Sequence, residues 1–149
     1  MHDPFAMRPF VGYNIGQYFD HWLSFGEKKN VQLPRIFHVN WFRKDAAGKF
    51  MWPGFGENAR VLDWILKRVE GEDAAVTSPV GFIPKKESFN LKGLPEIDWN
   101  GLFSTPKPFW EKEASAIKSY FDDNIGSDLP KKLSEEVDKL EKRIRKDNE

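Results

Sequence analysis

Hydrophobic side chains recur every three or four residues in several stretches of the chain, and this spacing predicts helices. One predicted helix spans 14–24 and a second spans 58–69, and two more fall within 105–147, the last of them beginning near Asp128. The last helix carries apolar side chains at steps of four, three and four residues, opposite a face of mixed lysine and glutamate. The apolar face of the helix at 58–69 consists of Val61, Leu62, Ile65 and Val69, with Trp64 beside it.

Alternating apolar and polar side chains predict short strands between these helices. At 35–42 the alternation places Phe37, Val39 and Trp41 on one face. A turn at 45–48 precedes a short returning strand at 49–52, and the apolar run at 80–83 lies between two prolines. Residues 85–105 have no regular pattern, and residues 1–12 are expected to form an extended, buried entry segment. The predicted fold class is α/β with mixed α+β character, in which helices outnumber strands.

The segment at 40–58 contains five aromatic side chains and four turn-forming residues. Because glycine and proline interrupt regular structure, these rings do not share one continuous face. Rings on loops either fill a core or surround a flat ligand, since stacking of a base on a ring contributes about 1–3 kcal/mol. The rings are Trp41, Phe42, Phe50, Trp52 and Phe55, and the turn formers are Gly48, Pro53, Gly54 and Gly56.

The composition excludes several classes of function. The chain has 149 residues and equal numbers of basic and acidic side chains, 23 of each, which gives no field that would attract nucleic acid. It has no cysteine for a disulfide, a zinc thiolate or a nucleophile. The three histidines lack metal-ligand spacing, and no glycine-rich phosphate loop ending in Gly-Lys-Ser/Thr is present. A soluble, intracellular chain of one domain is expected.

Asn58, at the start of the predicted second helix, has two possible uses. Its side chain is suited to capping the helix, which is the commoner role of asparagine at this position. Its amide also offers one donor and one acceptor, which match the hydrogen-bonding edge of a purine. Phe42, Phe50 and Phe55 are suited to lining the same pocket, although each ring taken alone is more often part of a core. The combination of rings, glycine-rich turn and helix start favours a ligand site.

Several motifs of the chain resemble GTP-dependent phosphoenolpyruvate carboxykinase, in order and at matching spacing. The two most specific are Asn-Trp-Phe-Arg-Lys at 40–44 and Phe-Met-Trp-Pro-Gly-Phe-Gly-Glu-Asn at 50–58. Others are His-Asp-Pro-Phe-Ala-Met-Arg-Pro-Phe at 2–10, Arg-Val-Leu-Asp-Trp at 60–64, Gly-Phe-Ile-Pro at 81–84 and Asn-Leu-Lys-Gly-Leu at 90–94. The resemblance covers essentially the whole chain and weakens in residue identity after Lys112.

The resemblance implies that 1–149 is the C-terminal part of the carboxykinase nucleotide-binding domain and that 40–58 is its guanine-binding segment. The base is then expected between Phe42 and Phe55, with Phe50 completing the pocket. The turn from Phe55 to Asn58, which includes Gly56 and Glu57, is expected to line the nucleotide, and Asn58 to read the guanine edge. The implied ligands are GTP and GDP, and the parent enzyme is expected to be monomeric, without nucleic acid or membrane partners.

The resemblance also places the catalytic machinery of the family before the matched segment: its phosphate-binding loop with a reactive cysteine, its Mn²⁺ or Mg²⁺ ligands, its oxaloacetate-binding arginine and its lid. The chain is therefore expected to be a piece of a longer enzyme or of a truncated gene, inactive by itself and cytoplasmic, with a mitochondrial form left open. Two alternatives stand beside this interpretation. One is a non-catalytic purine-nucleotide-binding module or pseudoenzyme, and the other is a helix-rich interaction domain whose rings are all core.

Overall fold

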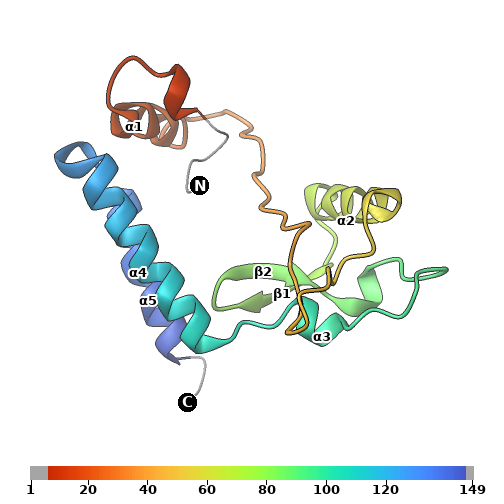
Figure 1. Cartoon of the computed structure of the whole chain (residues 1–149). Helices are drawn as coiled ribbons and strands as arrows, with labels where there is room; N and C mark the ends of the chain where they lie inside the picture. Colours follow the sequence, from red (N-terminus) through yellow and green to blue (C-terminus); the bar gives the residue numbers. More distant parts are fainter. Residues whose placement is uncertain (1–6, 147–149) are drawn as a thin grey trace. The chain divides into compact units, whose positions relative to one another are not determined.

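In the computed structural model of the chain, residues 7–146 are described, and they are mostly helical with one two-stranded sheet (Figure 1). The α-helices are α1 (Ile15–Phe25), α2 (Ala59–Glu70), α3 (Trp99–Leu102), α4 (Lys107–Asn124) and α5 (Lys131–Lys146). The strands are β1 (Ala75–Ser78) and β2 (Gly81–Pro84), and short 3-10 helices include Arg8–Phe10, Phe55–Glu57, Lys86–Ser88 and Gly126–Asp128. The four predicted helices are confirmed.

The described residues divide into two compact units. The helical unit contains the residues up to Pro34 and those from Pro106 onward, and the aromatic unit contains Arg35–Thr105. Within the part of the chain that the structure describes, no helix combines the length and the apolar character needed to cross a bilayer.

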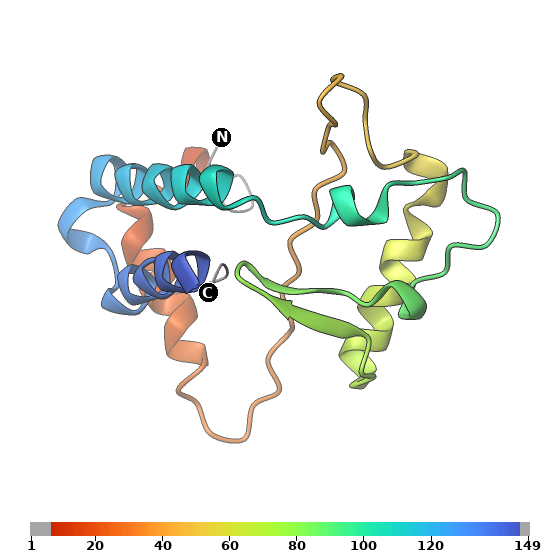
Figure 2. The ribbon, with the colours of Figure 1, turned by 90° about the horizontal axis from the view of Figure 1, so that it is seen from below.

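In the helical unit, α4 and α5 run side by side (Figures 1 and 2). A small core joins Ile15 and Phe19 of α1 to Ile125, which follows α4. The Asn14 side chain links the same elements: its oxygen accepts a hydrogen bond from the Gly16 N–H at 2.8 Å, and its amide nitrogen donates to the Ile125 carbonyl at 2.9 Å. The predicted inward face of α5 is confirmed, because Val137 and Ile144 are both buried.

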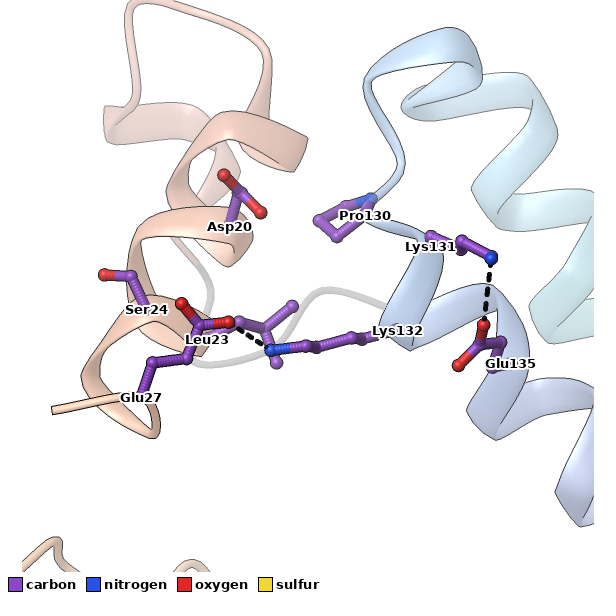
Figure 3. Close-up of a pocket in the computed structure, with 8 residues that line it drawn as sticks. All are labelled: Asp20, Leu23, Ser24, Glu27, Pro130, Lys131, Lys132 and Glu135. Atoms are coloured by element: carbon purple, nitrogen blue, oxygen red, sulfur yellow. Dashed lines mark hydrogen bonds and ion pairs between the residues drawn. The ribbon is translucent and has the colours of Figure 1, made fainter. Parts of the chain in front are cut away.

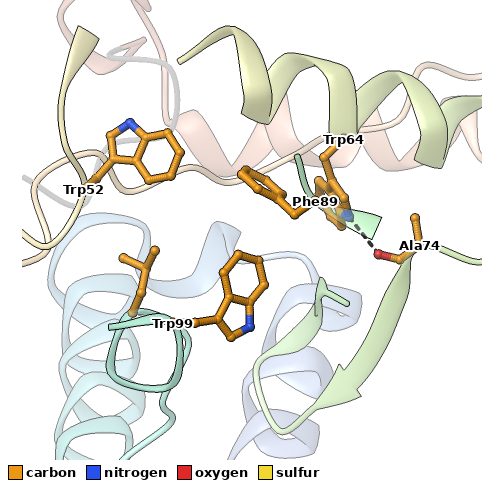
Figure 4. Packing of buried hydrophobic residues seen from close by; sticks show 6 residues of the cluster. Trp52, Trp64, Ala74, Phe89 and Trp99 are labelled. Atoms are coloured by element: carbon orange, nitrogen blue, oxygen red, sulfur yellow. Dashed lines mark hydrogen bonds between the residues drawn. The ribbon is translucent and has the colours of Figure 1, made fainter. Parts of the chain in front are cut away.

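The aromatic unit is built around buried rings, which Figure 4 shows. Its buried cluster consists of Trp52, Trp64, Ala74, Phe89, Trp99 and Leu102. Trp64 lies on α2 and donates its indole N–H to the carbonyl of Ala74 at 2.7 Å, which ties the helix to the chain just before β1. Strands β1 and β2 form an antiparallel hairpin in which Ala75 pairs with Pro84 and Ser78 with Gly81.

The strand predicted at 35–42 is not present as part of a sheet. Its alternation survives in the burial pattern, because Phe37, Val39 and Trp41 are partly buried while their neighbours are exposed. The predicted returning strand at 49–52 is reduced to an isolated bridge between Lys44 and Phe50. A ladder needs a partner strand as well as the right side-chain pattern, and the described residues supply no such partner for 35–42.

Four further details differ from the sequence prediction. β1 and α3 were not predicted, and the predicted apolar face of α2 is rotated. Trp64 is its most buried residue, whereas Leu62 and Val69 are 57% and 51% exposed. Of the entry segment expected at 1–12, residues 1–6 lie outside the described residues, and Phe10 is exposed rather than buried.

Candidate functional site

A tight hairpin turn between Arg43 and Met51 positions two of the predicted site rings. The Met51 N–H donates to the Arg43 carbonyl at 2.9 Å, and the Asp45 N–H donates to the Lys49 carbonyl at 2.9 Å. One carboxylate oxygen of Asp45 accepts hydrogen bonds from the backbone N–H groups of Ala47 and Lys49, each at 2.9 Å. An aspartate side chain that accepts hydrogen bonds from the backbone of its own turn stabilises that turn. Asp45 therefore favours this hairpin, which brings its two ends close together.

The Arg43 guanidinium anchors this turn to the end of α3. It donates to the carbonyl oxygens of Leu102 at 2.8 Å and Ser104 at 3.0 Å, and to the Ser104 hydroxyl at 2.7 Å. Three charge-assisted hydrogen bonds from one side chain hold the hairpin on the aromatic core. The rings that the hairpin carries are therefore attached to a defined support.

Three predicted site rings point away from that core. Phe42 is 72% exposed, Phe50 51% and Phe55 93%. The interpretation in which all the rings of the segment are core is therefore wrong for these three side chains. Trp41 and Trp52, from the same segment, pack inward and contact each other at a ring separation of 6.5 Å.

The structure brings Phe42 and Phe50 together and leaves Phe55 apart. The first two rings meet at a tilt of 62°, with 6.1 Å between their centroids. The Lys44 ammonium group lies over the Phe50 ring, 5.0 Å from its centroid. Among residues 7–146, no ring contact joins Phe55 to either of them, so Phe55 has a free face on its own turn.

The turn that carries Phe55 depends on Gly54. Gly54 has φ 119° and ψ −165°, a conformation that is essentially restricted to glycine. It leads into the 3-10 helix Phe55–Glu57, where the Glu57 carboxylate accepts a hydrogen bond from Arg60 Nε at 2.6 Å. Arg60 also donates to the carbonyl of Asn90 at 2.7 Å. Glu57 is thereby engaged in an ion pair, and a Cβ built at Gly56 meets nothing within 4 Å.

Asn58 precedes α2 but does not cap it with its side chain. Its side-chain oxygen instead accepts a hydrogen bond from the indole N–H of Trp52 at 2.9 Å. The capping role considered from the sequence is therefore wrong. The partner was missed, although a signal existed: a buried tryptophan N–H needs an acceptor, and Asn58 lies six residues further along the chain.

A hollow lies in the helical unit, between α1 and the start of α5 (Figure 3). Lys132 donates to the Glu27 carboxylate at 2.5 Å and thereby lowers the pKa of Glu27, while Lys131 lies 3.6 Å from Glu135. Each of the two lysines that line the hollow therefore forms an ion pair with a carboxylate, and Asp20 adds one further negative charge. The residues that line it are Asp20, Leu23, Ser24, Glu27, Pro130, Lys131, Lys132 and Glu135.

Metal-binding side chains are not gathered in the described residues, where no group of three or more His, Asp or Glu is placed to hold an ion. No donor set between residues 7 and 146 therefore fits the divalent metal that the resemblance implies for the parent enzyme.

Comparisons with known proteins agree with the motifs. The family model of the phosphoenolpyruvate carboxykinase C-terminal P-loop domain matches residues 1–143. The chain is 59% identical over 146 residues to the mitochondrial GTP-type phosphoenolpyruvate carboxykinase of Homo sapiens. The matched region covers 98% of this chain and 23% of the human protein.

Similar relatives include the cytosolic GTP-type carboxykinase of Gallus gallus, 53% identical over 97% of this chain, and the carboxykinase of Haemonchus contortus, 50% identical over 98%. The chain spans about a quarter of the length of these relatives, which are named for both the cytosol and the mitochondrion. From the match of 143 residues and these identities, the chain belongs to the GTP-dependent phosphoenolpyruvate carboxykinase family and corresponds to its C-terminal portion.

Proposed function

We propose that this chain supplies the guanine-binding pocket of a GTP-dependent phosphoenolpyruvate carboxykinase, which converts oxaloacetate and GTP into phosphoenolpyruvate, GDP and carbon dioxide. The observation that carries the proposal is the outward orientation of three phenyl rings in one segment whose two remaining rings, Trp41 and Trp52, pack against the aromatic core. Exposure of apolar rings to water costs free energy, and a group of such rings is typical of a binding surface. The three exposed rings therefore favour a ligand that covers them.

In the proposed pocket, the base lies between Phe42 and Phe55, and Phe50 forms a wall through its contact with Phe42. Each stacked face contributes about 1–3 kcal/mol, and stacking alone accepts any base. Selectivity for guanine therefore needs a polar group, and we assign this role to Asn58. Gly56, which has room for close approach, and Glu57 line the same turn.

The pocket orients the nucleotide, while bond breaking takes place on its phosphates. Correct orientation of the transferred group contributes to the rate because it removes the entropy cost of alignment. Phosphoryl transfer also requires cations that stabilise the charge of the transferring group, and in the parent enzyme a divalent metal supplies this. In this assignment the chain is part of an α/β nucleotide-binding domain in a cytoplasmic or mitochondrial enzyme.

The proposal is tested by titrating GDP into the chain while the tryptophan fluorescence is recorded. Trp41 and Trp52 lie on the same segment as the exposed rings, so nucleotide binding is expected to change their emission. Phe55→Ala should abolish this signal, because it removes one face of the stack without touching the core. Phe10→Ala, which removes another largely exposed ring from the helical unit, is the control and should leave the signal intact.

The same titration on the full-length carboxykinase that carries this segment distinguishes the alternatives. A response in both proteins supports a pocket that forms within this chain, as a free-standing purine-nucleotide-binding module also requires. A response in the full-length enzyme alone supports the carboxykinase assignment, with other segments completing the pocket. If Phe55→Ala leaves nucleotide binding unchanged in the full-length enzyme, the proposed pocket is wrong.

A further inference from the structure

The hydrogen bond between Trp52 and Asn58 connects the aromatic core to the proposed base site. Trp52 is 6% exposed and belongs to the buried cluster, whereas Asn58 is only partly buried and follows the turn that carries Phe55. The indole nitrogen lies 2.9 Å from the side-chain oxygen of Asn58. The bond therefore runs from a fixed interior group to a residue at the proposed ligand surface.

This bond determines which end of the Asn58 amide is available to a ligand. An indole N–H can only donate, so the atom that it contacts must be the amide oxygen and not the nitrogen. In residues 7–146 the amide NH₂ group of Asn58 donates to no other group. Asn58 therefore offers a ligand two N–H donors, while its best acceptor position is already occupied.

The orientation of the amide is held by the core. The Trp52 ring packs at 6.0 Å from Phe89 in an edge-to-face arrangement and at 6.5 Å from Trp41. A rotation of the amide by half a turn would place NH₂ against the indole N–H and leave a buried donor without a partner. That loss costs about 1–3 kcal/mol, so the orientation with the oxygen inward dominates.

A donor at this position distinguishes purines at one atom. Guanine carries an oxygen acceptor at position 6, whereas adenine carries an amino group that donates. The Asn58 NH₂ group donates to the guanine oxygen, whereas with adenine it would face another N–H donor. Hypoxanthine, the base of ITP, has the same oxygen at position 6 as guanine and lacks only the amino group at position 2. An N–H donor at position 6 therefore does not distinguish hypoxanthine from guanine.

The geometry points to Trp52 as a positioning residue for nucleotide selectivity, an inference that rests on the proposed function. Its indole N–H fixes the Asn58 amide so that the NH₂ group faces the base and selects a 6-oxo purine over a 6-amino purine. Trp52 itself touches no nucleotide in this arrangement. Its contribution is specific to position 6 and makes no distinction at position 2.

Trp52→Phe in the full-length carboxykinase tests this assignment, because it keeps an aromatic ring and removes the indole N–H. It also removes the five-membered part of the indole, and the control variant Trp64→Phe loses the same volume. The ratio of kcat/KM for GTP over ATP should fall about tenfold, which corresponds to the lower part of the range for an unpaired polar group. The ratio for GTP over ITP should stay unchanged. Trp64→Phe is the matched control: it removes an equally buried indole N–H that donates at 2.7 Å to a backbone carbonyl, and it should leave both ratios unchanged.

Asn58→Asp tests the same geometry while keeping Trp52, in case Trp52→Phe fails to fold. With one carboxylate oxygen held by the indole, the other oxygen would face the base as an acceptor. The preference for GTP over ATP should then fall further than in Asn58→Ala, which presents neither donor nor acceptor. Equal or smaller loss in Asn58→Asp would contradict an amide that is held with its oxygen inward.

The outcomes separate this inference from the proposed function. If Asn58→Ala lowers the GTP over ATP ratio and Trp52→Phe does not, the positioning role is wrong and the pocket stands. If Trp64→Phe lowers the ratio as much as Trp52→Phe, the effect is general loosening of the core, which also overturns the role. If neither Asn58→Ala nor Phe55→Ala changes the use of any nucleotide, the proposed pocket itself fails.

Discussion

The interior and the surface of the aromatic unit use the same kind of side chain for opposite purposes. Inside, Trp64, Phe89 and Trp99 form a buried cluster in which neighbouring rings meet at inclined angles. Outside, Phe42 and Phe55 are 72% and 93% exposed, although only short stretches of chain separate them from buried rings. The difference shows that aromatic content alone does not identify a core, and that the backbone turn decides which way each ring points.

Substitution of the buried rings should therefore lower the free energy of unfolding, whereas substitution of the exposed rings should weaken ligand binding. The largest effect is expected for Trp99→Ala. Trp99 is 9% exposed and packs at 4.6 Å from Phe103 and 5.4 Å from Phe89, so truncation leaves a cavity and costs about 3–5 kcal/mol. Urea unfolding of the chain measures this loss. Phe55→Ala serves as the comparison and should leave the unfolding midpoint nearly unchanged, and a similar loss in both variants would break the distinction.

A smaller effect is expected for Gly54→Ala, which tests the backbone that turns Phe55 outward. A Cβ at this position meets no atom within 4 Å, so the cost comes from the conformation at φ 119° and is about 1–3 kcal/mol. Gly56→Ala is the control, because its backbone needs no positive φ and its Cβ also meets nothing.

The expected result is a lower free energy of unfolding for Gly54→Ala and an unchanged one for Gly56→Ala. If the base approaches the turn as proposed, Gly56→Ala should nevertheless weaken GDP binding. Equal stability of the two variants in thermal unfolding would show that the Gly54 conformation does not constrain the turn.

The smallest effect is expected for Lys44→Gln, which removes the cation above Phe50. An exposed contact of this kind contributes about 0.5–1 kcal/mol, so the free energy of unfolding should fall by no more than that. Lys49→Gln removes a cation from the same hairpin, and no cation–π contact is found for Lys49 among the described residues. The two variants should differ measurably in chemical denaturation, and identical curves would show that the Phe50 ring gains nothing from Lys44.

Local patterns predicted the helices well, because their signals are contained within a few turns. The predicted helix at 58–69 corresponds to Ala59–Glu70, and the two helices expected in 105–147 correspond to α4 and α5. The candidate rings were also found from the sequence, since their crowding on a broken segment is a local signal. Whether they form the guanine pocket stays a prediction.

Features that depend on distant partners were not accessible in the same way. The alternation at 35–42 correctly indicated which side chains turn inward, but pairing depends on a second strand. The Asn58 cap was wrong because Trp52 competes for the same oxygen. The attachment of Arg43 to Leu102 and Ser104 spans about sixty residues, and no spacing rule predicts it.

The Arg43 contacts have a consequence for any attempt to reduce the site to a linear motif. A synthetic peptide covering 40–58 would contain every predicted site residue. It would lack the carbonyl acceptors of Leu102 and Ser104 and the ring of Phe89 that holds Trp52, so its own conformational entropy would oppose the arrangement. Grafting this segment onto another scaffold would transfer the side chains without their geometry, because the supports that orient them are encoded thirty to sixty residues further along the chain.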